Sequence, residues 1–111
     1  MKYSYAEYVS LFKAISDQTR LKIVDLLSSG EMCACQLLDN FNITQPTLSY
    51  HMRILCESGI VTGRRDGAWM YYRINGAVIE AISDFLIEIK SNNEQGIGKS
   101  KDNCNCQISN L

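Results

Sequence analysis

The fold is decided by the stretch Thr44-Gln45-Pro46-Thr47-Leu48-Ser49-Tyr50-His51. Thr44 has the short, oxygen-bearing side chain that caps a helix by accepting from free first-turn amides, and Pro46 is tolerated because those amides have no intrahelical partner. At about 100° per residue, Met52 and Leu55 fall within about 40° of Leu48, so this face should be core. The stretch therefore predicts a helix that begins after Thr44.

A shorter helix is predicted just before it, over about residues 33–40, with Leu37, Leu38 and Phe41 pointing inward. Two short helices joined by a few residues form a helix-turn-helix candidate, and the second is the one expected in the major groove of DNA. Its far side and exposed amino end carry polar groups of hydrogen-bonding size and one cation, which suits the reading of base edges. The predicted DNA-facing residues are Gln45, Thr47, Ser49, Tyr50 and Arg53.

Two β-prone runs follow, over residues 60–65 and 68–74, on either side of Asp66-Gly67. An Asp-Gly pair between such runs is a strong hairpin signal, and a hairpin that follows a helix-turn-helix is a wing. We place Arg64 and Arg65 at the tip of this hairpin, where they would reach phosphates or an adjacent minor groove. The alternative, that these two arginines serve only solubility, stays open.

Three further amphipathic helices are predicted over residues 4–16, 18–28 and 76–90. The apolar stripe of the last helix is wider than one small core requires, and the first helix is rich in aromatic side chains. Together they suggest a dimer interface, which a two-fold DNA reader needs to engage two half-sites. The predicted fold is mainly α with a β-hairpin wing, a homodimeric winged helix-turn-helix with the element order ααααββα. The stripe residues are Tyr5, Tyr8, Val9, Phe12 and Ile15, then Leu21, Val24 and Leu27 or their neighbours, then Val78, Ile79, Ile82, Phe85, Leu86 and Ile89.

The totals agree with one small globular domain. The chain has 111 residues, 46% of them apolar and 21% charged. It has no run of about 20 apolar residues and no basic-then-apolar amino end, so we expect a cytoplasmic protein without a membrane segment. Residues 1–90 would form the DNA-binding and dimerisation domain, and residues 91–111, rich in Asn, Gly, Ser and Lys, a flexible cysteine-containing tail.

The net charge of −1 is unusual for a nucleic-acid binder. The charge is not evenly spread, however. Residues 43–75 contain four arginines against Glu57 and Asp66, a local balance of +2. The predicted helix and wing are therefore the positive part of the chain.

A pair of cysteines lies in Glu31-Met32-Cys33-Ala34-Cys35-Gln36-Leu37, nine residues before the DNA-reading segment. Thiolates are the soft ligands that thiophilic ions select, and trivalent arsenic or antimony typically takes three of them. If Cys33 and Cys35 are both helical they point about 200° apart, so binding should unwind or tilt the start of that helix. For the third ligand we rank Cys104 or Cys106, on the tail, above Cys56, which lies at the edge of the core face.

Three motifs, in this order and spacing, resemble the ArsR/SmtB family of winged-helix, homodimeric, metal-released bacterial repressors. They are Ser16-Asp17-Gln18-Thr19-Arg20-Leu21, the segment 31–37 and Gln45-Pro46-Thr47-Leu48-Ser49-Tyr50-His51. The Cys-x-Cys variant most resembles the arsenite- and antimonite-responsive branch, which implies that Cys33 and Cys35 bind As(III) or Sb(III) as inducer. Some members have a further cysteine where this chain has Leu38, so the third ligand stays open.

The resemblance implies a repressor of a metalloid-resistance operon that binds double-stranded operator DNA as a homodimer. The last predicted helix has no histidine, and no cysteine precedes residue 33, so a zinc or cadmium sensor is less favoured. A phosphatase-like arsenate reductase needs an arginine six residues after its cysteine, which no cysteine here has, so we expect no enzyme. Two alternatives stay open: a thiol redox-sensing repressor, and a metalloid-carrying chaperone that does not bind DNA.

Overall fold

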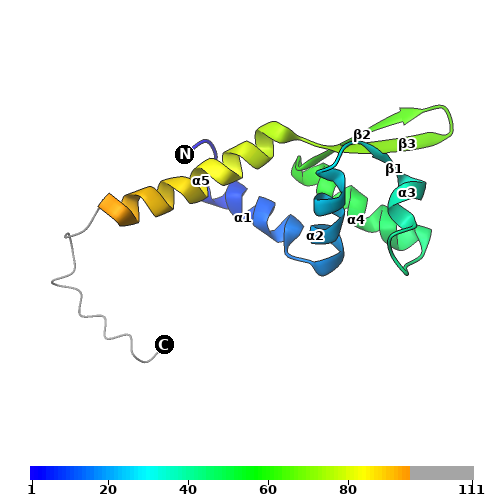
Figure 1. Ribbon diagram of the computed structural model, residues 1–111, viewed down its shortest axis with the longest axis horizontal. Helices are drawn as coiled ribbons and strands as arrows, with labels where there is room; N and C mark the ends of the chain where they lie inside the picture. The colour runs from blue at the N-terminus through cyan, green and yellow to red at the C-terminus, as the bar shows by residue number, and fades with distance from the viewer. Residues whose placement is uncertain (96–111) are drawn as a thin grey trace, which may run out of the picture.

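The helices and strands of the computed structural model are described over residues 1–95. Within these residues five helices and three strands follow one another, and the last helix and the β-hairpin form the two ends of this part of the molecule (Figure 1). The elements are α1 (Tyr5–Ile15), α2 (Gln18–Leu27), β1 (Met32–Cys33), α3 (Ala34–Leu38), α4 (Gln45–Ser58), β2 (Val61–Asp66), β3 (Trp69–Ile74) and α5 (Gly76–Gln95).

Local capping sets where the longer helices begin and end. The Asp17 side chain accepts from the N–H of Arg20 at 3.0 Å and so caps α2. Thr44 caps α4 in the same way, accepting from the N–H of Thr47 at 3.3 Å, as the sequence predicts. The C-terminal end of α4 is closed by Gly59 in the left-handed conformation at φ 88°, which glycine adopts without a Cβ clash.

The sheet has three antiparallel strands in the order β1-β3-β2. The hairpin β2–β3 is the predicted wing, and its turn falls at Gly67-Ala68. The two-residue strand β1 was not predicted; it pairs Met32 with Tyr72 and Cys33 with Tyr71. The fold class is confirmed, with the observed order ααβααββα in place of ααααββα.

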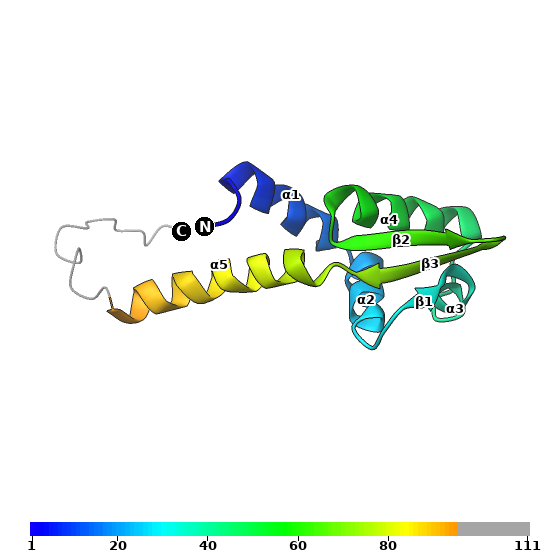
Figure 2. The same ribbon diagram turned by 90° about the horizontal axis from the view of Figure 1, so that it is seen from above.

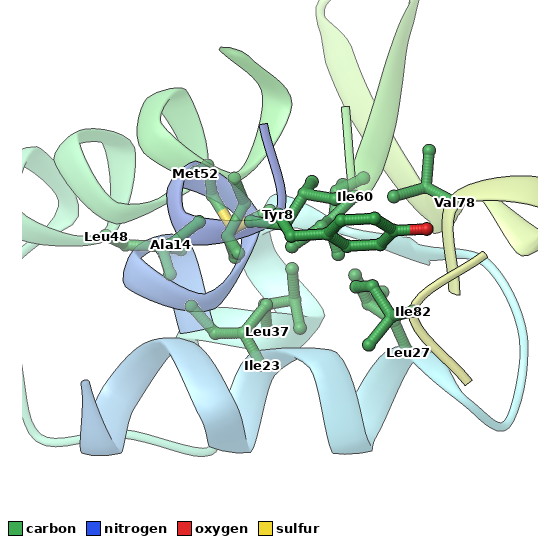
Figure 3. Close-up of a cluster of buried hydrophobic side chains, with 13 residues drawn as sticks. Tyr8, Ala14, Ile23, Leu27, Leu37, Leu48, Met52, Ile60, Val78 and Ile82 are labelled. Atoms are coloured by element: carbon green, nitrogen blue, oxygen red, sulfur yellow. The ribbon is translucent and has the colours of Figure 1, made fainter. Parts of the chain in front are cut away.

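The core lies where α1, α2, α3 and α4 meet the first turns of α5. Figure 3 shows side chains from all five helices and from the α4–β2 connection converging on one cluster. Leu48, Met52 and Leu55 are each at most 2% exposed, which confirms the predicted inward face of α4. The cluster comprises Tyr8, Leu11, Ala14, Ile23, Leu27, Leu37, Leu48, Met52, Leu55, Ile60, Val61, Val78 and Ile82.

Two predicted stripes need correction. In α1 the buried side chains are Tyr8, Leu11 and Ala14, whereas Tyr5 and Val9 are 71% and 48% exposed. In α2 the buried side chains are Ile23 and Leu27, and Leu21 is exposed. The spacing identified both helices, but it placed on the core face several side chains that are exposed to solvent.

Helix α5 extends past the rest of the fold (Figures 1 and 2). Its first half packs against α1, where the rings of Tyr8 and Phe85 stack with centroids 4.4 Å apart. It continues to Gln95, five residues beyond the predicted end of the domain at residue 90. Within residues 1–95, no helix combines the length and the apolar character needed to cross a membrane.

Candidate nucleic-acid interface and thiol site

The polar face of α4 is open to solvent. Gln45, Thr47, Ser49, Tyr50 and Arg53 are all exposed, while the core face of the same helix is closed. The Arg53 guanidinium lies 5.9 Å from the centroid of the Tyr50 ring, so the two side chains extend side by side. The helix therefore presents hydrogen-bonding groups and one cation on a single accessible face, as base readout requires.

A polar anchor fixes the middle of α4 to the junction of α1 and α2. Arg20 donates from Nε to the carbonyl of Ala14 at 2.7 Å, and its Nη1 lies 3.0 Å from Nδ1 of His51. Asp17 completes the group, with Oδ2 3.9 Å from Nδ1 of His51. These contacts give His51 a structural role within the anchor.

A cleft of about 490 Å³ separates α4 from the wing. Gln45 and Ser49 of α4 line one wall, and Arg65 and Trp69 of the wing line the other. Cys35 lines the same cleft, so one of the two thiols opens onto the surface between α4 and the wing. The complete lining is Ala34, Cys35, Leu38, Gln45, Leu48, Ser49, Met52, Arg65, Ala68, Trp69, Met70 and Tyr72.

Arg64 and Arg65 were predicted at the tip of the hairpin. They lie instead within β2, just before its last residue, Asp66. Neighbouring residues of a strand face opposite sides of a sheet. Arg65 lines the cleft, and Arg64 points away from it to Glu31, with Nη2 2.8 Å from Oε1 and Nε 3.0 Å from Oε2. This pairing lowers the pKa of Glu31, chiefly through the hydrogen bonds from Arg64.

The two thiols of the Cys-x-Cys motif converge. Cys33 ends β1 in an extended conformation at φ −82° and ψ 160° and serves as the N-cap of α3, while Cys35 is in the first turn of that helix. Their Sγ atoms are 2.7 Å apart. The prediction that both cysteines are helical and point about 200° apart is therefore wrong, because the strand-to-helix corner turns Cys33 toward Cys35.

The environments of the two thiols differ. Cys33 is 7% exposed and Cys35 is exposed. The pKa of Cys33 is lowered, first by the hydrogen bond from the Cys35 thiol and then by the backbone N–H of Gln36. The pKa of Cys35 is raised, first because its thiol donates to Cys33 and then by desolvation. Of the two thiols, Cys33 is therefore the one that ionises first as the pH rises.

Cys33 and Cys35 are the thiols that the described residues bring together. Cys56 is half-buried against the core, and burial raises its pKa, which fits the packing role expected for it. Within residues 1–95 no cluster of three or more His, Cys, Asp or Glu side chains has metal-binding geometry. The two cysteines predicted as possible third ligands, Cys104 and Cys106, lie outside the described residues.

Comparison with known proteins gives the same architecture and a family. Residues 17–62 match the model of the bacterial regulatory proteins of the arsR family. The chain is 42% identical over 103 residues to the arsenical resistance operon repressor of Staphylococcus aureus, an alignment that covers 93% of this chain and 99% of that protein. The chain belongs to the ArsR family.

Solved structures of ArsR-family regulators have this fold. One ArsR family transcriptional regulator superposes with a TM-score of 0.79 at 23% identity, covering 87% of this chain and 100% of that one. A homodimeric winged helix-turn-helix DNA-binding domain from Mycobacterium bovis superposes with a TM-score of 0.64 at 24% identity, covering 85% of this chain and 87% of that one. The winged-helix assignment of this ArsR-family protein therefore rests on its own elements and on these structures.

Sequence reasoning did not single out Glu31 or the anchor formed by Arg20. Their partners lie 33 and 31 residues away, so no local spacing indicates them. A cross-strand pair of opposite charges could have been suspected only once β1 was placed beside β3. Glu31 joins the thiol motif to the wing, and Arg20 joins the amino-terminal helices to α4.

Proposed function

We propose that this ArsR-family protein represses an arsenical-resistance operon and leaves its operator when As(III) or Sb(III) binds cysteine thiolates. The observation that carries the proposal is the convergence of Cys33 and Cys35, with Sγ atoms 2.7 Å apart at the start of the helix-turn-helix. The printed name of the Staphylococcus aureus relative, an arsenical resistance operon repressor, supports the same reading.

For DNA binding, we assign α4 to the major groove and the wing to the flanking backbone. Helix α4 would supply Gln45, Thr47, Ser49, Tyr50 and Arg53, and the wing would supply Arg65. Arg64 is instead paired with Glu31. Two copies of the chain would engage two half-sites, and the homodimeric relative of Mycobacterium bovis supports that assembly. The protein would act in the cytoplasm, where its operator DNA is found.

For inducer binding, the Cys33 and Cys35 thiols each displace one hydroxyl group of trivalent arsenous acid. Each As–S bond forms as an As–O bond breaks, and the hydroxyl group leaves as water with the thiol proton. The lowered pKa of Cys33 favours it as the first nucleophile, because the thiolate is the reactive form. We assign the third bond to Cys104 or Cys106, since three thiolates complete the preference of the ion.

The coupling between the two sites follows from their position. Cys35 lines the cleft that Gln45, Ser49 and Arg65 also line, so an ion at the thiols lies beside the DNA-facing groups. A tenfold loss of DNA affinity needs about 1.4 kcal/mol of coupling free energy, and bound DNA must weaken inducer binding by the same factor.

The close thiol pair also favours one alternative, a thiol redox sensor. Two thiols this close can lose two electrons and two protons to a peroxide, which forms a disulfide and two molecules of water. A metalloid carrier without DNA binding is the other alternative, and it predicts no shift of operator DNA at all.

The test is a titration of the DNA complex under reducing conditions, followed by gel shift or fluorescence anisotropy. Arsenite, antimonite, zinc, cadmium and, without reductant, peroxide are compared side by side. We expect arsenite or antimonite at low micromolar concentration to release the DNA, and zinc and cadmium to release much less. Release by peroxide alone would favour the redox sensor, and failure to bind operator DNA would favour the carrier.

The tail is tested in the full chain with the double variant Cys104→Ser and Cys106→Ser. We expect its DNA binding to be unchanged and its arsenite response to be weakened about tenfold, since one of three As–S bonds is lost. A trivalent arylarsenical has two exchangeable positions and should release both proteins alike. An unchanged arsenite response would place the third ligand elsewhere.

A further inference from the structure

One cross-strand row of the sheet joins the thiol site to the wing. Cys33 of β1 is the register partner of Tyr71 of β3, and Tyr71 is the register partner of Arg64 of β2. Residues directly opposite on neighbouring strands project from the same face of a sheet. The three side chains therefore share one face, which is opposite to the face that carries Arg65 into the cleft.

A side-chain contact reinforces the row. The Arg64 guanidinium lies 4.6 Å from the centroid of the Tyr71 ring and makes two hydrogen bonds to the carboxylate of Glu31, of 2.8 and 3.0 Å. Glu31 precedes Cys33 by two residues. The segment that leads into the thiol site is therefore held to the wing twice, by the β1–β3 pairing and by a bidentate ion pair.

We propose that the Glu31–Arg64 pair passes the state of the thiol site to the wing, and that Arg64 is a positioning residue of this response. The inference rests on the proposed function. When an ion draws the Cys33 and Cys35 sulfurs into its own bond geometry, the end of β1 shifts and carries Glu31 with it. Arg64 follows Glu31, the wing turns, and Arg65 leaves its DNA-facing position.

The two attachments differ in strength, and this difference supports transmission from Glu31 to Arg64. Strand β1 has only two residues, so its pairing with β3 gives way easily to a shift at Cys33. Arg64 has a second carboxylate neighbour, Asp66, but at 3.8 Å and without the two-point geometry. The fork of an arginine bonded to both carboxylate oxygens fixes direction as well as distance. Movement of Glu31 is therefore transmitted to Arg64 rather than absorbed.

The expected size of the effect is modest. The Arg64 and Glu31 side chains are 54% and 31% exposed, and ion pairs this exposed change an equilibrium by about two- to fivefold. The pair would thus carry part of the inducer response, and the cleft around Cys35 the remainder.

The experiment compares the full-length wild type with Glu31→Gln, Arg64→Gln and the double variant. For each we measure operator affinity with and without saturating arsenite, and take the ratio as the response. Glu31→Gln should keep its operator affinity without arsenite within about twofold and lose about threefold of the response. Arg64→Gln should lose the same part of the response, and the double variant no more than either single variant.

A reciprocal measurement separates transmission from a merely structural effect. Operator DNA should weaken arsenite binding to the wild type, and in Glu31→Gln that weakening should shrink by the same factor of about three. Arsenite affinity of the free protein should stay at the wild-type value, because both thiols are intact. Loss of structure would instead lower the affinities for both DNA and arsenite. It would not reduce the effect of arsenite on DNA binding and the effect of DNA on arsenite binding by the same factor.

Two control variants sharpen the result. Asp66→Asn removes the more distant neighbour of Arg64 and should leave the response unchanged. Arg65→Gln should weaken operator binding without arsenite and change it much less with arsenite, because the bound ion already withdraws Arg65 from the DNA. An unchanged response in both Glu31→Gln and Arg64→Gln would overturn the inference while leaving the proposed function intact, and so would a loss of operator affinity in Arg64→Gln as large as in Arg65→Gln. A wild type that arsenite does not release would overturn the proposed function, and this inference with it.

Discussion

Cys33 and Cys35 are separated by one residue, yet they differ in exposure and in proton affinity. Cys33 is buried with a lowered pKa, and Cys35 is exposed with a raised one. The hydrogen bond between the two sulfurs is the largest cause in both cases. The thiol that an external reagent reaches first is therefore the less reactive of the two at neutral pH.

Replacing Cys33 with alanine should lower the pKa of Cys35. The variant removes the sulfur that accepts the Cys35 proton and also the charge that Cys33 acquires on ionisation. The rate of iodoacetamide alkylation at Cys35, followed by peptide mass spectrometry from pH 6 to 10, should rise at lower pH than in the wild type. The rate at Cys56, whose pKa is raised by burial, serves as the internal control. Superimposable profiles for Cys35 would contradict the coupling.

At the residue scale, the sequence identified the pair of thiols and the exposed face of α4 but not their geometry. The choice of Gln45 and Ser49 needed only helical periodicity, which is local. The distance between Cys33 and Cys35 depends on the extended conformation of Cys33, which β1 acquires by pairing with Tyr71, 38 residues away (71 − 33). A partner that distant leaves no trace in the spacing of the motif.

Helices α2 and α4 each begin at a side chain that the sequence makes recognisable, Asp17 and Thr44. Asp17 caps α2, and its pKa is lowered, first by the hydrogen bond from the backbone N–H of Arg20. A carboxyl group whose pKa is lower in the folded state stabilises the fold at pH above its ordinary value of 3.8, and loses that contribution as the pH falls through the folded pKa.

Asp17→Ala should therefore lower the free energy of unfolding at pH 7 by about 1 kcal/mol, the usual cost of losing an N-cap. Between pH 5 and pH 3 the wild type should lose more stability than the variant, since only the wild type has the Asp17 carboxylate to protonate. Urea denaturation followed by circular dichroism at fixed protein concentration measures both quantities. Parallel pH profiles would show that the carboxylate of Asp17 does not cap α2.

At the scale of elements, local signals predicted the helices and the hairpin, and nonlocal ones were missed. The Thr44 cap and the hairpin signal of Asp66-Gly67 are written in neighbouring residues; the cap and the hairpin were both confirmed, with the turn itself at Gly67-Ala68. Strand β1 is too short to show any alternation, so Cys33 was predicted to be the start of the next helix. The environment of Arg64 was missed for the same reason. Its pairing with Glu31 depends on the three-dimensional fold and not on neighbouring residues.

The molecule as a whole leaves apolar side chains open on α1 and α5, the two helices that pack against each other beside the core (Figure 2). Periodicity placed Tyr5, Val9, Leu86 and Ile89 on apolar stripes, and all four are exposed in the single chain. A sequence pattern shows that a side chain is destined for burial and not which chain buries it. We expect a second copy of the chain to cover this surface.

Leu86→Glu should convert the dimer to a monomer, because Leu86 is 50% exposed on α5 and a charge there would be buried at the proposed interface. Operator affinity should fall by about a hundredfold or more, since a monomer engages only one half-site. Sedimentation velocity and anisotropy measure the two effects. The matched control is Leu21→Glu, since Leu21 is 55% exposed but lies on α2. Equal behaviour of the two variants would contradict the assignment of the interface.

The most direct measurement is arsenite release of operator DNA by the double variant Cys33→Ser and Cys35→Ser, alongside the wild type under reducing conditions. Serine keeps the size and the hydrogen bonding of each side chain but removes the soft sulfur ligand. Without arsenite, we predict that both proteins bind the operator with similar affinity. At low micromolar arsenite the wild type should dissociate and the double variant should stay bound. Dissociation of the double variant at the same arsenite concentration would contradict the claim that Cys33 and Cys35 form the inducer site.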